Sequence, residues 1–375
     1  MLNVLHAVLH VFDFEAGTAT FSRRELDLGS RPVVSYVRSF LRKAANSAES
    51  RHGEFQPTSG FVGELDQYLD GRRDFVDLSV QIGQFLFEEI RRSDAPEQCD
   101  LLVADFEDEA EPGAGTKVDV AGNAEVGDGA DFADAVDAAM QQALEASYEG
   151  HGDRKFALIL LPRKKAFMHE MEGSDGSAYN ELLRNDAALP NPTQKVDCYA
   201  VVNTRTMAID FSDKPRMVAG EERYVIPDGL LQCSTHASTR EVIQQVTSIV
   251  EEVANEYGAN ATVAVSKAKA LVSENAGESE TLLPWDIGDE VFEDAPQMRE
   301  RYQQRTREAD LPERVQVKRS VATRMAKSQK IRTDTGIEIT FPSEYSATSD
   351  FIAFLTQPDG SINIEIKGIG KIENR

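Results

Sequence analysis

The stretch from Glu107 to Asp153 limits what this chain can fold into more than any other feature does. It consists mostly of Ala, Gly, Asp and Glu, and residues 101–150 hold 13 acidic residues and one lysine, a net charge of −12. Such a segment cannot bury enough apolar surface to offset the entropy lost on ordering it. The flanking runs 101–106 and 156–161 each predict a buried strand. We therefore predict an acidic, flexible insertion over residues 108–154, with at most a loose helix over 131–148.

Helical and strand patterns alternate over the rest of the chain. Apolar residues recur at helical spacing after Ser30, between 74 and 92, and after a capping box of Ser238 and Glu241, where Gly258 ends the helix. The helix over 74–92 is predicted to carry one apolar stripe, which serves either the core or a partner, made of Phe75, Leu78, Ile82, Phe85, Leu86 and Ile90. A polar helix is predicted over 296–310. Strands are predicted over 8–14, 18–22, 198–203, 206–211, 336–341, 351–355 and 361–366.

This mixture of hairpins and helices is typical of the α+β class rather than of a doubly wound parallel sheet. The length of 375 residues suits two domains. We predict that residues 1–234 form a domain of mixed or antiparallel sheet with helices, interrupted by the insertion. Residues 235–375 are predicted to form a smaller α+β domain that ends in a β-hairpin.

The net charge argues at first sight against a nucleic-acid partner. The chain holds 64 acidic and 40 basic residues, a formal charge of −24, and a uniformly acidic surface repels phosphates. The N-terminus lacks the features of a signal peptide, and no apolar stretch is long enough to span a membrane. Three widely spaced cysteines form neither a disulfide framework nor a zinc motif. These features predict a cytoplasmic protein.

The acidic charge is not evenly distributed, however, because the segment 314–332 is strongly basic. It contains seven cations and no acid: Arg314, Lys318, Arg319, Arg324, Lys327, Lys330 and Arg332. On a helix, Arg324, Lys327 and Lys330 would form one stripe, and Val317, Val321 and Met325 would form an apolar one.

Two interpretations of this basic segment are open: an ordinary solvated surface, or a surface that contacts phosphates. No aromatic residue lies in the segment, which disfavours stacking on single-stranded bases and favours sequence-independent contact with the backbone of a duplex. If all seven cations met phosphates of B-DNA, log K would fall with log salt at a slope of about −6.

We find no pattern that predicts catalysis. The sequence His169-Glu170 lacks the second histidine of a metalloprotease motif, and the glycine pairs of the acidic stretch follow no strand and precede no Walker lysine. His6 and His10 would share one face of a strand, where packing is the simpler role. We therefore predict no catalytic residue, no metal site and no cofactor.

Several strings, in the same order along the chain, resemble the bacterial nucleoid-associated protein family of the 37-kDa type. They include DFVDLSVQIGQFLFEEI, CDLLVADFED, FALILLPRKKAFMHEME and LPNPTQKVDCYAVVN, and the most specific run is Lys330–Glu338 near the end of the chain. The resemblance implies a cytoplasmic, nucleoid-located protein that binds double-stranded DNA with little sequence preference as a homodimer. It supplies no catalytic residues. The family usually joins strands 101–106 and 156–161 by a short connection, so the acidic stretch departs from its pattern.

We therefore predict a non-enzymatic protein that binds double-stranded DNA through its backbone phosphates. Two alternatives stay open. One is an acidic scaffold that engages DNA-acting proteins, and the other is an uncharacterised hydrolase built from carboxylates scattered along the sequence.

Overall fold

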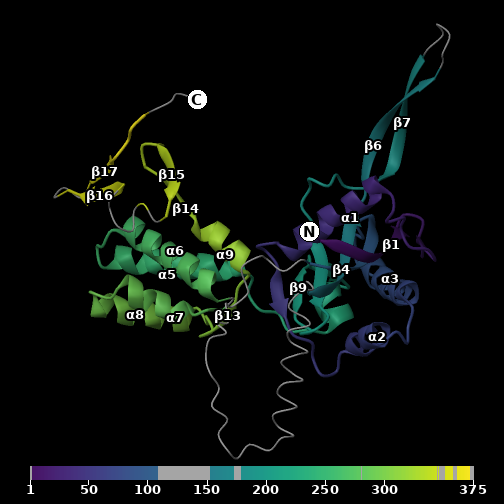
Figure 1. The fold of residues 1–375 in the computed structure, drawn as a ribbon, viewed down its shortest axis with the longest axis horizontal. Helices are drawn as coiled ribbons and strands as arrows, with labels where there is room; N and C mark the ends of the chain where they lie inside the picture. Colours follow the sequence, from purple (N-terminus) through teal and green to yellow (C-terminus); the bar gives the residue numbers. More distant parts are fainter. Residues whose placement is uncertain are drawn as a thin grey trace, which may run out of the picture. The chain divides into compact units, whose positions relative to one another are not determined.

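The computed structural model describes residues 2–108, 153–172, 179–279, 281–343, 345, 351–357 and 361–371 (Figure 1). The chain divides into two compact units, residues 1–45 with 53–235 and residues 46–52 with 236–375. Both units contain helices and strands, which confirms the α+β class. The independent folding of residues 1–234 and 235–375 as two domains stays a prediction.

The first unit is built on a sheet whose strands within this unit follow the order β2-β1-β4-β5-β8-β9. Neighbouring strands in this order run antiparallel. The strands are β1 (Asn3–Asp13), β2 (Thr18–Thr20), β4 (Cys99–Glu107), β5 (Arg154–Pro162), β8 (Cys198–Asn203) and β9 (Ile209–Ser212).

Both faces of this sheet are buried. Because side chains alternate along a strand, Leu101 and Val103 of β4 pack into one core and Leu102 and Ala104 into the other. The first core is covered by α2 (Gly60–Leu69), α3 (Phe75–Arg91) and the π-helix η1 (Val225–Leu231), and the second by α1 (Arg31–Ala45). The continuous apolar runs of β4 and β5 follow from this two-sided burial.

The two strands predicted on either side of the acidic stretch are confirmed, and they are direct neighbours. β4 pairs with β5 along its whole length, with Glu107 opposite Arg154. Just beyond this pair, the Asp108 amide donates to the Asp153 carbonyl at 3.1 Å. Arg154, the last residue of the predicted insertion, therefore belongs to the sheet. The predicted flexibility and the predicted loose helix fall on residues 109–152, which lie outside the described residues.

The helix predicted over 74–92 is confirmed as α3, whose first turn is capped by Asp74. The Asp74 carboxylate accepts the amides of Val76 and Asp77, an arrangement that satisfies two of the amides left unpaired at a helix start. The buried face of the helix differs in one position from the predicted stripe. Phe85 is 36% exposed, whereas Phe87, outside the stripe, is buried with its ring 5.5 Å from that of Phe12 on β1.

The strand predicted over 206–211 begins later than expected. β9 starts at Ile209, and Met207 in the preceding turn has a left-handed φ of 57°. The turn is held by Asn203, whose side-chain oxygen accepts the amides of Arg205 and Thr206. These bonds keep the chain out of the sheet for longer than the sequence pattern indicated.

Two further pairs of strands belong to the first unit. β6 (Lys164–Glu172) and β7 (Tyr179–Ala188) form a long antiparallel hairpin that projects from the rest of the unit in Figure 1. β10 (Arg216–Val218) and β11 (Glu221–Arg223) form a short one.

The second unit packs its helices around one apolar core. They are α5 (Thr239–Glu256), α6 (Ala261–Glu278), α7 (Pro284–Val291), α8 (Pro296–Glu308) and α9 (Arg319–Ala326). The predicted capping box of α5 is confirmed, since the Ser238 hydroxyl accepts the Glu241 amide and the Glu241 carboxylate accepts the Ser238 amide. The predicted polar helix is confirmed as α8.

Three strand pairings, each two to five residues long, form three small antiparallel sheets in this unit. They join β12 (Thr281–Leu282) to β13 (Val315–Gln316), β14 (Ser328–Arg332) to β15 (Glu338–Pro342), and β16 (Ile352–Thr356) to β17 (Ile362–Ile366). The strands predicted over 336–341, 351–355 and 361–366 are thereby confirmed, while the turn predicted at 358–360 lies outside the described residues.

We predict that His10 makes the first unit sensitive to acid. Its ring is fully buried, Nδ1 accepts the Ser22 amide at 3.1 Å, and Nε2 lies 3.1 Å from the Ser79 hydroxyl, which itself donates to the Val76 carbonyl. This arrangement holds a neutral ring with its proton on Nε2, and burial together with the positive charge of Arg23 lowers the pKa of His10 to about 4.

Because the folded protein then binds fewer protons than the unfolded chain, stability contributed by neutral His10 is present above pH 6.5 and is lost as the pH falls towards 4. Urea unfolding of the wild type and of His10→Gln at several pH values should show a difference that changes by up to about 3 kcal/mol across this window. A constant difference would contradict the prediction.

We predict that Gly288 is required for the packing of α7 on α8. A Cβ at this position would lie 1.9 Å from the ring of Tyr302, which is fully buried and donates its hydroxyl to the Pro284 carbonyl at 2.7 Å. Gly288→Ala should lower the free energy of unfolding of the second unit by at least about 1–3 kcal/mol. The fluorescence of Trp285, the chain's single tryptophan, reports on α7 directly.

A matched control is Gly277→Ala in α6, where a Cβ meets no atom within 4 Å. That variant should be neutral or more stable by about 0.5–1 kcal/mol, since alanine loses less backbone entropy on folding. Equal effects of the two substitutions would show that the Tyr302 ring adjusts freely.

Candidate nucleic-acid interface

The middle of the basic segment forms α9, a short helix that packs its apolar side against the unit and exposes its cations. Val321, Ala322 and Ala326 are buried, and α9 packs against α5 and α6. The cations Arg319 and Arg324 are exposed on the outer side. Val321 and Met325 of the predicted apolar stripe lie on α9, buried and half-buried, whereas the placement of Val317 on the helix is wrong, because this buried residue precedes α9.

The helix does not continue far enough to carry the predicted basic stripe. α9 ends at Ala326, whose carbonyl accepts the Ser343 hydroxyl at 2.7 Å, and β14 begins at Ser328. Arg324 and Lys327 still lie one turn apart, because Lys327 keeps helical backbone angles at the C-cap. The placement of Lys330 on the same helical stripe is wrong, because Lys330 lies on a strand.

On β14, successive side chains point to opposite faces of the strand, so the cations are exposed and the residue just before them is buried. Lys330 and Arg332 are exposed, whereas Gln329 is buried and hydrogen-bonded to Ser266 of α6. Lys330 forms an ion pair with Glu338 of β15, with 2.6 Å between Nζ and the carboxylate. Both side chains are about half exposed, so solvent screens this pair in part, but the carboxylate still lies beside Nζ and competes with any other anion for it.

The two remaining cations of the segment differ in exposure. Arg314 is exposed immediately before β13. Lys318 is half-buried: its amide donates to the Thr239 hydroxyl at 3.2 Å, and its Nζ lies 3.4 Å from the Ser50 hydroxyl. Lys318 therefore anchors the start of α9, and its ammonium group is partly used within the unit.

Five cations of the segment are exposed and form no ion pair with any other residue that the structure describes. They are Arg314, Arg319, Arg324, Lys327 and Arg332. We call these five residues the exposed cations. Unpaired cations at the surface are those that can exchange their counterions for phosphates at the lowest cost.

Sequence reasoning missed one neighbour of this surface, Lys269 on α6. Its Nζ donates to the Ser328 carbonyl at 3.3 Å, at the start of β14, and burial lowers the pKa of its ammonium group. No signal in the sequence links residue 269 to the basic segment, because the contact depends on how α6 packs against α9.

Two arginines of α8, which lie close to the segment in sequence, are paired with acids of α5. Arg301 donates to Glu256 at 3.0 Å, and Arg305 lies 3.6 Å from Glu252 and 3.7 Å from Glu256. Arg307 of the same helix is exposed and lies over the Trp285 ring, 5.3 Å from its centroid.

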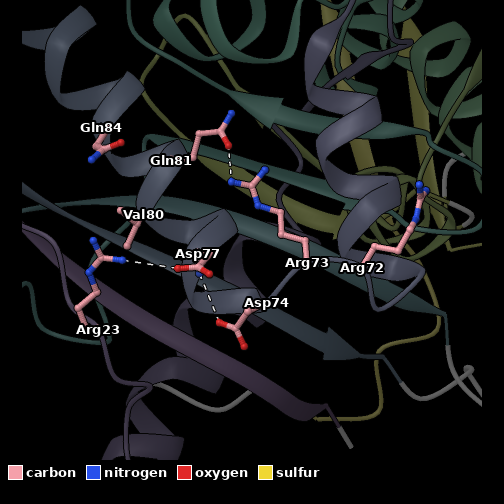
Figure 2. Close-up of a pocket in the computed structure, with 8 residues that line it drawn as sticks. All are labelled: Arg23, Arg72, Arg73, Asp74, Asp77, Val80, Gln81 and Gln84. Atoms are coloured by element: carbon pink, nitrogen blue, oxygen red, sulfur yellow. Dashed lines mark hydrogen bonds and ion pairs between the residues drawn. The ribbon is translucent and has the colours of Figure 1, made fainter.

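A pocket on the first unit also gathers basic residues, but its arginines are paired (Figure 2). Arg23 lies 3.5 Å from Asp77, Arg72 lies 2.7 Å from Asp70, and Arg73 forms an ion pair with Glu64 and donates to Gln81. Figure 2 shows Asp74 on the same side, where it caps α3. With each arginine already facing a carboxylate, the pocket offers a phosphate little net attraction.

The histidines considered from the sequence, and the tryptophan Trp285, have the following positions in the structure. His6 and His10 share the strand face that packs on α3, as predicted: the His6 ring lies 5.2 Å from the Phe75 ring, and His10 lies beside Ser79. His169 lies on β6. Trp285 donates to the Leu311 carbonyl at 3.2 Å.

The three cysteines are buried thiols, and burial raises the pKa of Cys99 to about 12 and those of Cys198 and Cys233 to about 11. Among the residues that the structure describes, no three His, Cys, Asp or Glu side chains come close enough together to hold a metal ion. None of the helices in the described ranges has the length and apolar composition needed to cross a membrane.

A comparison with known protein families identifies the family to which the chain belongs. The sequence matches the family described as Nucleoid-associated protein YejK over residues 8–373, nearly the whole chain. The chain belongs to this nucleoid-associated family. The match confirms the resemblance found in the sequence, and it is consistent with a DNA-binding role in the nucleoid. A comparison with curated proteins gives no match.

Proposed function

We propose that this protein binds double-stranded DNA in the bacterial nucleoid with little sequence preference, without catalysis, and as a homodimer. The observation that carries the proposal is the run of exposed cations from Arg314 through α9 to β14, in a member of a nucleoid-associated family. We place the protein in the cytoplasm, where the nucleoid lies.

The chemistry of the segment favours contact with phosphates over the recognition of bases. Arginine and lysine side chains of an exposed surface attract the phosphate backbone and release its counterions, whatever the base sequence. The segment 314–332 contains no aromatic residue on which unpaired bases could stack. Two members of the original set contribute less, since Lys318 anchors α9 and Lys330 is paired with Glu338.

We predict that DNA binding is strongly salt-dependent and requires the exposed cations. If the five contact phosphates, log K should fall with log salt at a slope of about −4.5. Arg324→Glu combined with Lys327→Glu should weaken binding by at least about tenfold at low salt and make the slope less steep by about 2. The measurement is fluorescence anisotropy with random-sequence duplexes over a salt series.

The matched control is Arg72→Glu combined with Arg92→Glu, which changes the net charge equally at exposed arginines of the first unit. The control should bind DNA nearly as tightly as the wild type. The proposal is overturned if the wild type does not bind at low salt, or if the two double variants behave alike.

We further predict that Glu338 restrains Lys330. Glu338→Gln removes the carboxylate 2.6 Å from Nζ and leaves a side chain of the same size, so Lys330 becomes available to phosphates. DNA affinity should rise at low salt and the slope should steepen by about 1. An unchanged slope would exclude Lys330 from the interface.

A second candidate function rests on a different surface. Exposed acids occur along α5 and in and after α7, among them Glu251, Glu252, Glu290, Glu293 and Asp294. Such a surface suits a basic partner, so the protein could engage DNA-acting proteins through it. Capture of partner proteins that withstands nuclease treatment, and that is lost when these acids are changed to lysine, would support this second function.

A further inference from the structure

The β6–β7 hairpin projects from the first unit as an isolated pair of strands, which is an unusual arrangement for a stable protein. Within the described ranges, β6 and β7 pair only with each other, and Figure 1 shows them extending from the body of the first unit. An isolated two-stranded hairpin is marginally stable in water. Each strand also presents an outer edge of unpaired backbone groups, which is a template for another strand.

The apolar residues of this hairpin are among the most exposed in the described structure. Phe167 is 74% exposed, Leu182 71% and Met168 50%. Phe167 and Leu182 lie on one face, since Phe167 is opposite Arg184 and His169 is opposite Leu182, while Met168 lies on the other. Apolar surface of this kind, on both faces of a projecting element, marks a site of association.

Two opposite charges of β6 lie at equal distances along the strand from Phe167, whereas Lys165 and Glu172 of the same strand do not follow this symmetry. Lys164 lies three residues before it and Glu170 three residues after it. Glu170 is opposite Glu181 on β7, an arrangement that is destabilising for like charges. Neither Lys164 nor Glu170 forms an ion pair with another residue that the structure describes.

We propose that β6 pairs edge to edge, antiparallel, with β6 of a second copy of this chain, with Phe167 opposite its own counterpart. In this register Lys164 of each copy lies opposite Glu170 of the other, so one two-fold axis forms two ion pairs and brings the two Phe167 rings together. When two antiparallel strands are related by a two-fold axis normal to the sheet, one residue must lie opposite the same residue of the other copy. This register meets that condition at Phe167. It also places each Lys164 opposite a Glu170.

The resulting sheet has four strands, in the order β7-β6-β6-β7, and closes the outer edge of both β6 strands. Four strands with a shared apolar centre are stable where a lone hairpin is not. A second copy fits better than an unrelated partner, because the charge pattern of β6 is complementary to itself.

This inference takes up the homodimer of the proposed function and names its interface. Its tests contain no DNA, so failure of the β6 interface leaves the proposal of DNA binding intact, and failure of DNA binding leaves the interface intact.

The first test is the mass of the full-length protein in solution by light scattering and sedimentation. The wild type should be a dimer and Phe167→Glu a monomer at micromolar concentration. Leu182→Glu is the matched control, since Leu182 is equally exposed but lies on β7, and it should stay dimeric. Because both positions are exposed, neither variant threatens the fold, which circular dichroism checks.

The second test is a charge exchange. Lys164→Glu and Glu170→Lys should each weaken the dimer by about tenfold, and the two together should restore it, because each ion pair reforms with reversed signs. A structural role within one chain would give no such rescue.

The third test is a cross-link. Phe167→Cys should form a covalent dimer on mild oxidation, whereas Leu182→Cys should not, and the native cysteines are buried and leave the background low. A monomeric wild type overturns the proposal. So does a dimer that is unaffected by Phe167→Glu, which would direct attention to another surface such as the exposed Ile362 and Ile366 of β17.

Discussion

An ion pair between a buried carboxylate and a partly exposed arginine, at the end of the central sheet, is the interaction on which the first unit depends. Asp105 of β4 is completely buried and accepts three bonds from the Arg154 guanidinium of β5, at 3.1, 3.0 and 2.5 Å. Tyr68 of α2 donates its hydroxyl to the same carboxylate at 2.5 Å, and the guanidinium lies over its ring. One buried charge thereby joins two strands and a helix. Because a buried carboxylate without its partner is very costly, this contact strongly favours the direct pairing of β4 with β5.

That pairing has a consequence for the acidic stretch between the two strands. Its ends are brought together at Asp108 and Asp153, next to the ion pair, so the sheet is complete without residues 109–152. The largest block of negative charge is therefore separated in the chain from the strands that form the core. The net charge of −24 describes the sequence as a whole and says little about any one surface.

In the described part of the second unit, some cations are paired with acids and others are left unpaired. Acids of α5 pair with Arg301 and Arg305 of α8, whereas the exposed cations that follow have no described counterpart. If two chains associate through β6, each dimer carries two such basic segments, and a second segment binds the same DNA at a raised effective concentration. Weak contacts with phosphates would then add up to useful affinity without any recognition of bases.

The sequence by itself determined the class of the fold, most of its elements and the location of the basic segment. Apolar periodicity located α3, α5, β4 and β5, and the capping box marked the start of α5, because these signals arise from neighbours along the chain. Tertiary structure decided the features that depend on residues distant in the sequence. It ended α9 at Ala326, placed Lys330 on a strand beside Glu338, buried Phe87 rather than Phe85, and brought Lys269 to β14. Each of these outcomes depends on which distant residue occupies the adjoining space, and that is settled only when the elements pack.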